Sequence, residues 1–172
     1  VRRAHEAAAA YRRRRVETRS QAPRYEVADV LEARHHPHAA GRPQEAAGVT
    51  VRAAGRLQAW GAWDRAERLC TETMSWSPEH RRERMPCHML LGDLAVQRGR
   101  YDPAADHFRQ ALIISADLGD RDGLATAYRR LGVVADVRGR YDRAKDCYRQ
   151  AMALRKELGD HLARPGRRPP SA

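Results

Sequence analysis

The chain repeats its own sequence at a fixed offset of 40 residues. The 30 residues from Leu91 to Asp120 align without a gap with those from Leu131 to Asp160, and 16 of the 30 positions are identical. Apolar residues recur in both copies at three- and four-residue spacing, which is the pattern of an amphipathic helix. A helical period of about 20 to 50 residues is typical of stacked units that bury their apolar faces only against a neighbouring unit. The sequence therefore predicts an all-α solenoid of antiparallel helix pairs.

Each copy is expected to form two helices joined by a short turn. In the second copy, Gly139 follows the first apolar stripe and suits the left-handed residue that ends a helix. Asp142 is expected to be the N-cap of the second helix, which would end at Gly159. The buried stripe of that helix is expected to contain Ala144, Cys147, Tyr148, Ala151, Met152 and Leu158.

Residue size suits close helix packing. Phe108 and Tyr148 are expected to fill the space between neighbouring helix pairs. Small residues would lie where paired helices approach most closely, at Gly92, Ala104, Gly132 and Ala144.

These positions resemble the tetratricopeptide repeat family. The matching residues are Leu91, Gly92, Ala104, Phe108 and Ala111 in one copy and Leu131, Gly132, Ala144, Tyr148 and Ala151 in the next, with a weaker copy shifted by 38 at Gly61, Trp63, Asp64 and Ala66. The resemblance covers residues 50–160 and implies a right-handed superhelix, with a period of 40 residues instead of the family's usual 34 or so. It also implies that the first helix of each pair lines a concave groove for a partner peptide.

The resemblance, carried over position by position, gives a set of groove residues with charged, polar and aliphatic side chains. They are Arg52, Gln58, Met89, Asp93, Val96, Gln97, Arg129, Val133, Asp136 and Val137. Such a surface would hold an extended or helical peptide by hydrogen bonds and shallow apolar contacts. The alternative interpretation is that these side chains only face solvent. Val133 and Val137 favour binding, because they are aliphatic and lie off the buried stripe.

A second resemblance concerns the connectors between the copies. Leu118-Gly119-Asp120 with Gly123, together with the Gly99 turn, looks like the repeat arrays of bacterial STAND-type regulators, which are signal-transduction ATPases, and of related transcriptional activators. This resemblance implies the sensor or regulatory part of a signalling or transcriptional system. It also leaves open that the chain is a truncated fragment of a larger regulator, with no independent role.

The sequence predicts three parts. Residues 1–49 are expected to form irregular, basic, linker-like helices, residues 50–160 the solenoid, and residues 161–172 a disordered tail rich in Pro and Arg. Pro37 is expected to end a helix over residues 25–36, which follows another over residues 4–18. Within the solenoid, a degenerate repeat spans residues 50–80, and clear repeats span residues 81–120 and 121–160.

The net charge of +11 is concentrated at the two ends of the chain. Residues 61–160 carry 18 basic and 16 acidic side chains, whereas residues 1–60 carry 12 Arg against 6 acids and residues 161–172 carry three Arg and no acid. An alternative function is therefore a nucleic-acid-binding accessory protein that uses its basic ends, including the cluster at residues 12–15. No aromatic-rich RNA-binding signature or helix-turn-helix pattern accompanies them. We expect the partner to be a protein or peptide.

The sequence contains no motif for catalysis or cofactor binding. We expect no enzyme activity, no cofactor and no metal site: His35, His36 and His38 lack further ligands nearby, and Asp120 and Asp122 are expected to cap the next helix rather than to begin a calcium loop. The three cysteines form no CxxC pair and indicate free thiols. With no signal peptide and no apolar run near 18 residues, we expect a cytoplasmic protein without a membrane span.

Overall fold

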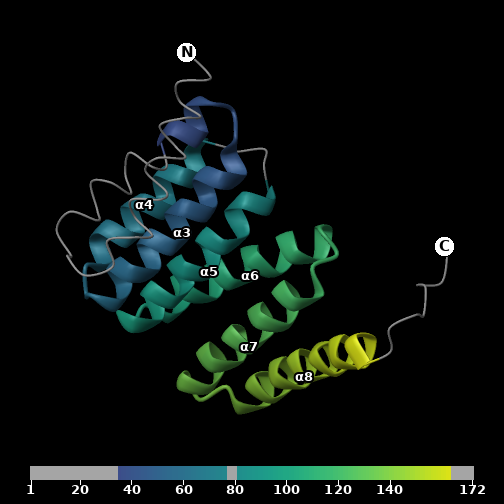
Figure 1. Cartoon of the computed structure of the whole chain (residues 1–172). Coiled ribbons are helices and arrows are strands. Elements are labelled where there is room, and N and C mark those ends of the chain that lie inside the picture. Colours follow the sequence, from purple (N-terminus) through teal and green to yellow (C-terminus); the bar gives the residue numbers. More distant parts are fainter. Residues whose placement is uncertain (1–34, 77–80, 164–172) are drawn as a thin grey trace. The chain divides into compact units, whose positions relative to one another are not determined.

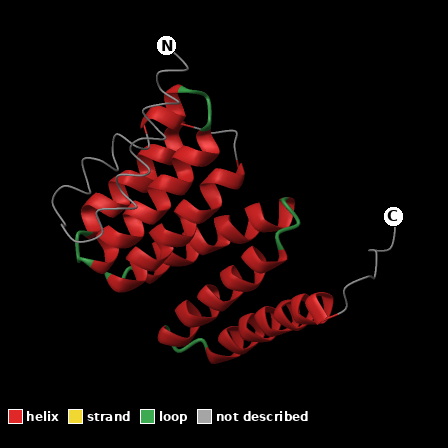
Figure 2. Cartoon of the chain, viewed as in Figure 1, coloured by secondary structure: helices red, strands yellow, loops and turns green. Residues whose placement is uncertain are grey.

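The computed structural model describes residues 35–76 and 81–163, and these residues form helices joined by short turns (Figure 1). Figure 2 shows no strand in this part of the chain, so the predicted all-α class is confirmed. None of the helices described is long and apolar enough to cross a membrane. A helical segment over residues 35–39 is followed by α3 (Pro43–Ala59), α4 (Trp63–Trp76), α5 (Arg81–Gln97), α6 (Tyr101–Asp117), α7 (Arg121–Val137) and α8 (Tyr141–Ala163).

The chain divides into two compact units, residues 1–94 and residues 95–172, with the boundary inside α5. In the first unit α3 packs against α4, and in the second unit α7 packs against both α6 and α8. Because α3 begins at Pro43, the predicted start of the solenoid at residue 50 cuts through a helix. The predicted helix over residues 4–18, and all but the end of that over residues 25–36, lie outside the described residues.

Every described turn between helices contains a glycine in the left-handed region of the backbone map. After α7, the amide of Gly139 donates to the carbonyl of Asp136 and the amide of Arg140 donates to that of Ala135, both at 2.8 Å. This pair of bonds satisfies the last carbonyls of the helix and recurs after α3, α5 and α6. The predicted helix end at Gly139 is confirmed. The glycines of these turns, with φ between 65° and 75°, are Gly41, Gly61, Gly99, Gly119 and Gly139.

The core of the first unit joins α3, α4 and the first part of α5. Cys70 of α4 and Cys87 of α5 are fully buried in it. The side chains of Thr50 on α3 and Thr73 on α4 meet in this core, with their hydroxyl oxygens 2.9 Å apart. Each hydroxyl also lies within 3.0 Å of a backbone carbonyl oxygen of its own helix. One hydroxyl can therefore donate across the helix pair while the other donates to its own helix, which leaves neither unsatisfied.

In the second unit, a glycine lets α7 and α8 approach closely. A Cβ on Gly132 would lie 2.6 Å from Cε1 of Tyr148, so the tyrosine ring packs directly on the α7 backbone. The predicted close approach at Gly132 is confirmed. However, Tyr148 fills the space within the α7–α8 pair and not between neighbouring pairs, because its ring points at its own partner helix. Phe108 of α6 is fully buried.

Several predicted details of α8 are wrong. The helix begins at Tyr141, so Asp142 lies in the first turn and is not the N-cap; the carboxylate there still lies at the positive end of the helix dipole. Gly159 does not end the helix, because its backbone is not left-handed, and α8 continues to Ala163. The predicted tail from residue 161 thus begins inside a helix, and residues 164–172 lie outside the described part. Met152, predicted to be buried, is 73% exposed.

Pro37 does not end a helix as predicted. Residues 35–39 are helical, and Pro37 is buried among them. The turn comes later, at Gly41 with φ of 73°.

Candidate functional site

Helix α7 keeps one exposed strip between its two packed faces. A Cβ on Gly123 would meet Ser115 of α6, and a Cβ on Gly132 would meet Tyr148 of α8, which identifies the two faces. The side chains between these faces are exposed or half-buried. Helical spacing places them in one row, which we call the α7 strip: Asp122, Thr126, Arg129, Val133, Asp136 and Val137.

The start of α7 is held against α6. Asp120 is the N-cap, and its carboxylate accepts a hydrogen bond of 3.0 Å from the amide of Gly123. A Cβ on Gly123 would lie 2.5 Å from Oγ of Ser115, so this close approach requires glycine. The prediction that Asp120 caps the helix is confirmed. The cap and this close packing fix the backbone of the first turn of α7, where the α7 strip begins.

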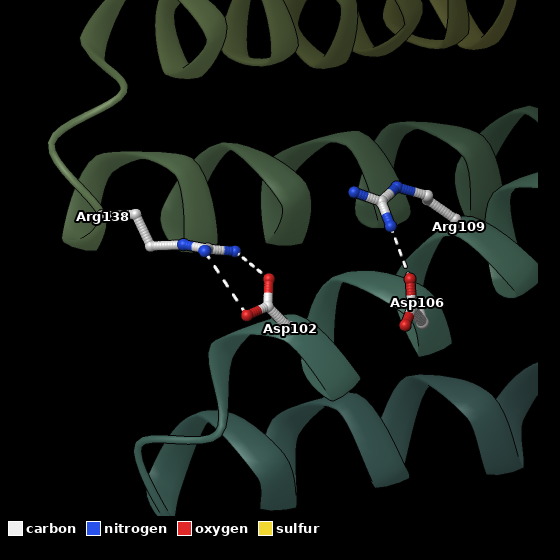
Figure 3. Close-up of polar contacts among 4 residues, drawn as sticks. All are labelled: Asp102, Asp106, Arg109 and Arg138. Atoms are coloured by element: carbon white, nitrogen blue, oxygen red, sulfur yellow. Dashed lines mark hydrogen bonds and ion pairs between the residues drawn. The ribbon is translucent and has the colours of Figure 1, made fainter.

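The end of α7 is tied to the start of α6 by a charged pair. Figure 3 shows two nitrogens of the Arg138 guanidinium directed at the two carboxylate oxygens of Asp102, with the longer contact at 3.4 Å. One turn further along α6, Arg109 pairs with Asp106 at 2.5 Å (Figure 3). Asp102 is 77% exposed, so its pair with Arg138 contributes no more than about 1 kcal/mol to stability. Its two-point geometry nevertheless favours the antiparallel alignment of α6 and α7.

The guanidinium of Arg155, on α8, contacts the α7 strip. Nη2 of Arg155 lies 3.3 Å from the hydroxyl of Thr126 and 3.6 Å from a carboxylate oxygen of Asp122. Next to it, Arg121 donates to Glu157 at 2.5 Å. These contacts hold the last turns of α8 against the first turns of α7.

The phenol of Tyr148 also belongs to this surface. Burial raises its pKa, the Asp136 carboxylate and the Cys147 thiol raise it further, and the Arg129 guanidinium opposes the rise. Tyr148 therefore lies close enough to Arg129 and Asp136 for both charges of the strip to act on it. On α7, Arg129 and Asp136 place a cation and an anion about one turn before and after Val133.

The structure brings together four of the ten predicted groove residues, Arg129, Val133, Asp136 and Val137, all on the α7 strip. Val137 is 53% exposed and Val133 is half-buried. A groove that combines these four with the predicted residues of the first unit stays a prediction. Of the remaining predicted residues, Arg52 and Gln97 are exposed, and Gln58, Met89, Asp93 and Val96 are half-buried.

The residues of α3 and α5 divide between the two units. Arg52 and Gln58 lie on α3, where the Gln58 carbonyl accepts a hydrogen bond of 3.2 Å from the indole of Trp63 and so takes part in the turn to α4. On α5, Met89 and Asp93 belong to the first unit, whereas Val96 and Gln97 follow the boundary after residue 94.

Sequence reasoning missed the contributions of Tyr148 and Arg155 to the strip. The sequence places Tyr148 in the buried stripe of α8, and its ring packs on Gly132, but the charges of Arg129 and Asp136 also act on its phenol. Arg155 stands where the first copy has Ser115, which is fully buried. A long cation at a position where the other copy has a small residue indicates that this side chain reaches the surface, and this difference could have identified Arg155.

Other candidate chemistry finds no support in the described residues. These residues contain no group of three or more His, Cys, Asp or Glu side chains placed to hold a metal ion. A hydrogen bond from Cys70 lowers the pKa of Cys87 against the effect of burial, with help from Arg84. Because both thiols are buried, neither is placed to attack an external substrate. Burial raises the pKa of Cys147, which makes this half-buried thiol less reactive.

Sequence comparison supports the repeat resemblance over part of the chain. The family model described as tetratricopeptide repeat matches residues 84–157, which run from α5 into α8 and include the α7 strip. This match covers less than half of the chain. No curated protein matches the sequence.

Solved structures share the fold at low sequence identity. The crystal structure of BtubC (BKLC) from P. vanneervenii is 18% identical, with a TM-score of 0.63 over 98% of this chain and 79% of that chain. The crystal structure of MamA is 13% identical, with a TM-score of 0.58 over 91% of each chain. These similarities confirm the all-helical solenoid and carry no information on function. The resemblance to STAND-type regulators stays a prediction.

Proposed function

We propose that the chain is a protein-interaction scaffold that binds a peptide segment of a partner protein on the α7 strip. The observation that carries this proposal is Val137, which is 53% exposed on a helix whose two other faces are packed. The match of residues 84–157 to tetratricopeptide repeats supports it, because such repeats typically bind peptides along their first helices.

The α7 strip offers complementary contacts to a short peptide. Val133 and Val137 are one turn apart and provide a shallow site for one aliphatic side chain. Arg129 and Asp136 flank this site with opposite charges, so a peptide with an acid and a base on either side of its aliphatic anchor would match it. Because α7 is packed on both sides, the protein loses little conformational entropy on binding.

A peptide selection tests this proposal. A displayed library of random 12-residue peptides is selected on the full chain, and the affinities of the enriched peptides are measured by fluorescence anisotropy. Val137→Asp should weaken binding about tenfold, because it places a charge against the aliphatic anchor. Ile113→Asp is the matched control, because Ile113 is 51% exposed but lies on α6, and it should leave the affinity unchanged. Equal affinities for the two variants would contradict the proposal.

Nucleic-acid binding through the basic ends is the alternative function. It predicts affinity for a duplex DNA of about 20 base pairs that falls steeply between about 50 and 200 mM salt. It also predicts that Val137→Asp has no effect. Peptide binding at the α7 strip predicts an affinity that depends little on salt and is weakened by Val137→Asp, because the main contact is aliphatic.

We further propose that this surface serves as the sensor or regulatory part of a larger signalling or transcriptional system. The resemblance of the Leu118-Gly119-Asp120 connector to repeat arrays of STAND-type regulators supports this role. The coding sequence upstream of Val1 provides the test. An in-frame nucleotide-binding domain is the expected result, and a stop codon directly upstream would contradict it.

A further inference from the structure

The outer side of α8 differs from the same side of α6. Helix α7 packs against α6, and there Ala105 is only 5% exposed and Leu112 is half-buried. The matching residues of α8 are Lys145 and Met152. Met152 is 73% exposed and Tyr141, on the same side, is 70% exposed. In the described part of the chain, no further helix follows α8 to cover this side as α7 covers α6.

This side of α8 is basic as well as apolar. Five residues share it at successive helical turns, and we call them the α8 stripe: Tyr141, Lys145, Arg149, Met152 and Lys156. The stripe contains three cations, and one exposed acid, Asp142, lies beside it in the first turn. Lys145 and Lys156 are the only lysines of the chain, and neither forms an ion pair with any residue that the structure describes. Arg149 pairs with Asp146 at 3.5 Å.

We propose that the α8 stripe binds an amphipathic helix of another protein, with carboxylates on both sides of its apolar face. Tyr141 and Met152 would contact that apolar face, and Lys145 and Lys156 would pair with the carboxylates. Charge complementarity selects this occupant, because unpaired cations beside an exposed apolar surface favour an acidic partner and repel a basic one.

The α6–α7 pair indicates how such a helix would lie. Arg138, at the end of α7, pairs with Asp102 in the first turn of α6. Asp142 is the matching residue of α8, and it has no ion-pair partner in the described residues. The bound helix would therefore run antiparallel to α8, with a basic residue near its C-terminus opposite Asp142.

Charge argues against the chain's own termini as occupants. Residues 161–172 carry three Arg and no acid, and residues 1–34 carry nine Arg against five acids. Each segment as a whole is net positive, which disfavours docking against Lys145 and Lys156. A second copy docked stripe to stripe would also place cations against these lysines. The α8 stripe is a surface distinct from the α7 strip, so this proposal does not depend on peptide binding at that strip.

A charge-swap experiment tests this proposal. Two synthetic 18-residue peptides are compared, both Ala-rich helices with a row of Leu along one face and one Arg in the last turn. The positions on both sides of the Leu row are Glu in the acidic peptide and Lys in the basic peptide. Their affinities for the full chain are measured by fluorescence anisotropy. The acidic peptide should bind and the basic peptide should not. The double variant K145E/K156E should weaken the acidic peptide at least about tenfold and allow the basic peptide to bind.

Control variants separate binding at the α8 stripe from a general effect of net charge. R140E/R143E changes the net charge by the same amount at exposed residues outside the stripe and should leave the acidic peptide's affinity unchanged. Val137→Asp should also leave it unchanged, which distinguishes this site from the α7 strip. K145A/K156A should weaken binding without introducing acids, and circular dichroism checks the helix content of each variant.

Three results would overturn the proposal. The first is equal binding of both peptides, or failure of the acidic peptide to bind. The second is equal loss of affinity in K145E/K156E and R140E/R143E. The third is a dimer of the unmodified chain in sedimentation experiments that K145E/K156E dissociates, because the occupant would then be a second copy.

Discussion

Gly132 sets the distance between α7 and α8. A Cβ there would lie 2.6 Å from Cε1 and 2.8 Å from Cδ1 of Tyr148, inside any normal carbon contact. Gly132→Ala should therefore displace the ring and lower the free energy of unfolding by up to about 2 kcal/mol, although alanine favours the helix by up to about 1 kcal/mol. Urea unfolding followed by circular dichroism measures this change.

Gly159 provides the matched control for Gly132. It also lies inside a helix, but nothing lies within 4 Å of where its Cβ would be. Gly159→Ala should therefore stabilise the chain by about 0.5–1 kcal/mol. In a Tyr148→Ala background, Gly132→Ala should become stabilising too. If it stays as destabilising as before, the tyrosine ring is not the cause of the strain.

Tyr148 should make the free energy of unfolding of the chain decrease at alkaline pH. Its pKa is raised in the folded chain, with burial as the largest cause, so folding favours the neutral phenol. That contribution is fully present below the unfolded pKa of about 10 and is lost as pH rises through the folded pKa. The unfolding free energy of the unmodified chain should fall more steeply above about pH 10 than that of Tyr148→Phe.

The charged residues of the strip should shift this titration in opposite directions. Arg129→Ala should raise the pKa of Tyr148 further, and Asp136→Asn should lower it. The difference in absorbance at 295 nm between each variant and its Tyr148→Phe counterpart measures the phenol alone. Identical titrations in both variants would show that Tyr148 does not sense the α7 strip.

Helix ends depend on more than local sequence. Leu-Gly-Asp occurs at residues 118–120 and again at residues 158–160. Gly119 is left-handed, with φ of 65°, and ends the helix before α7, whereas Gly159 continues α8. The sequence around each glycine predicts the same helix end. The outcome differs because α7 follows and packs against α6 after the first glycine, and no described helix follows α8.

Alanine at the two glycines should have opposite effects. Gly119→Ala forces a side chain into the left-handed region and should cost about 1–2 kcal/mol. Gly159→Ala should instead stabilise α8, because its backbone is helical. Thermal unfolding of both variants measures the difference between them. Destabilisation of similar size in both would mean that Gly159 also ends its helix.

The helices themselves are largely predictable from the sequence. The spacing of apolar residues predicts a buried stripe on α7 that consists of Leu124, Ala127, Tyr128, Leu131, Val134 and Ala135. The alanines and Val134 are buried, whereas the other three are half-buried. The sequence also predicts a helix over residues 44–60 that ends before Gly61, and α3 (Pro43–Ala59) differs from that prediction by one residue at each end. The predicted start of α8 is wrong because Asp142 suits an N-cap chemically, whereas the helix begins at Tyr141.

At the scale of the whole molecule, the repeat predicts the fold class but only part of the candidate site. Arg129, Val133, Asp136 and Val137 follow from one helix and its register, so a period and a face are sufficient to group them. Tyr148 and Arg155 reach the same surface from α8, which depends on how two helices pack. A groove across both units depends on still longer-range packing, which no spacing in the sequence determines.

The most direct test of peptide binding on the α7 strip is to locate a bound peptide on the chain. Methyl NMR spectra of the full chain are recorded with and without a 12-residue peptide enriched by selection on that chain. The methyl signals of Val133 and Val137 should shift on binding, while those of Ile113 on α6 and Val51 on α3 stay in place. Shifts confined to Ile113 or Val51, with Val133 and Val137 unmoved, would contradict the assignment of the α7 strip as the binding surface.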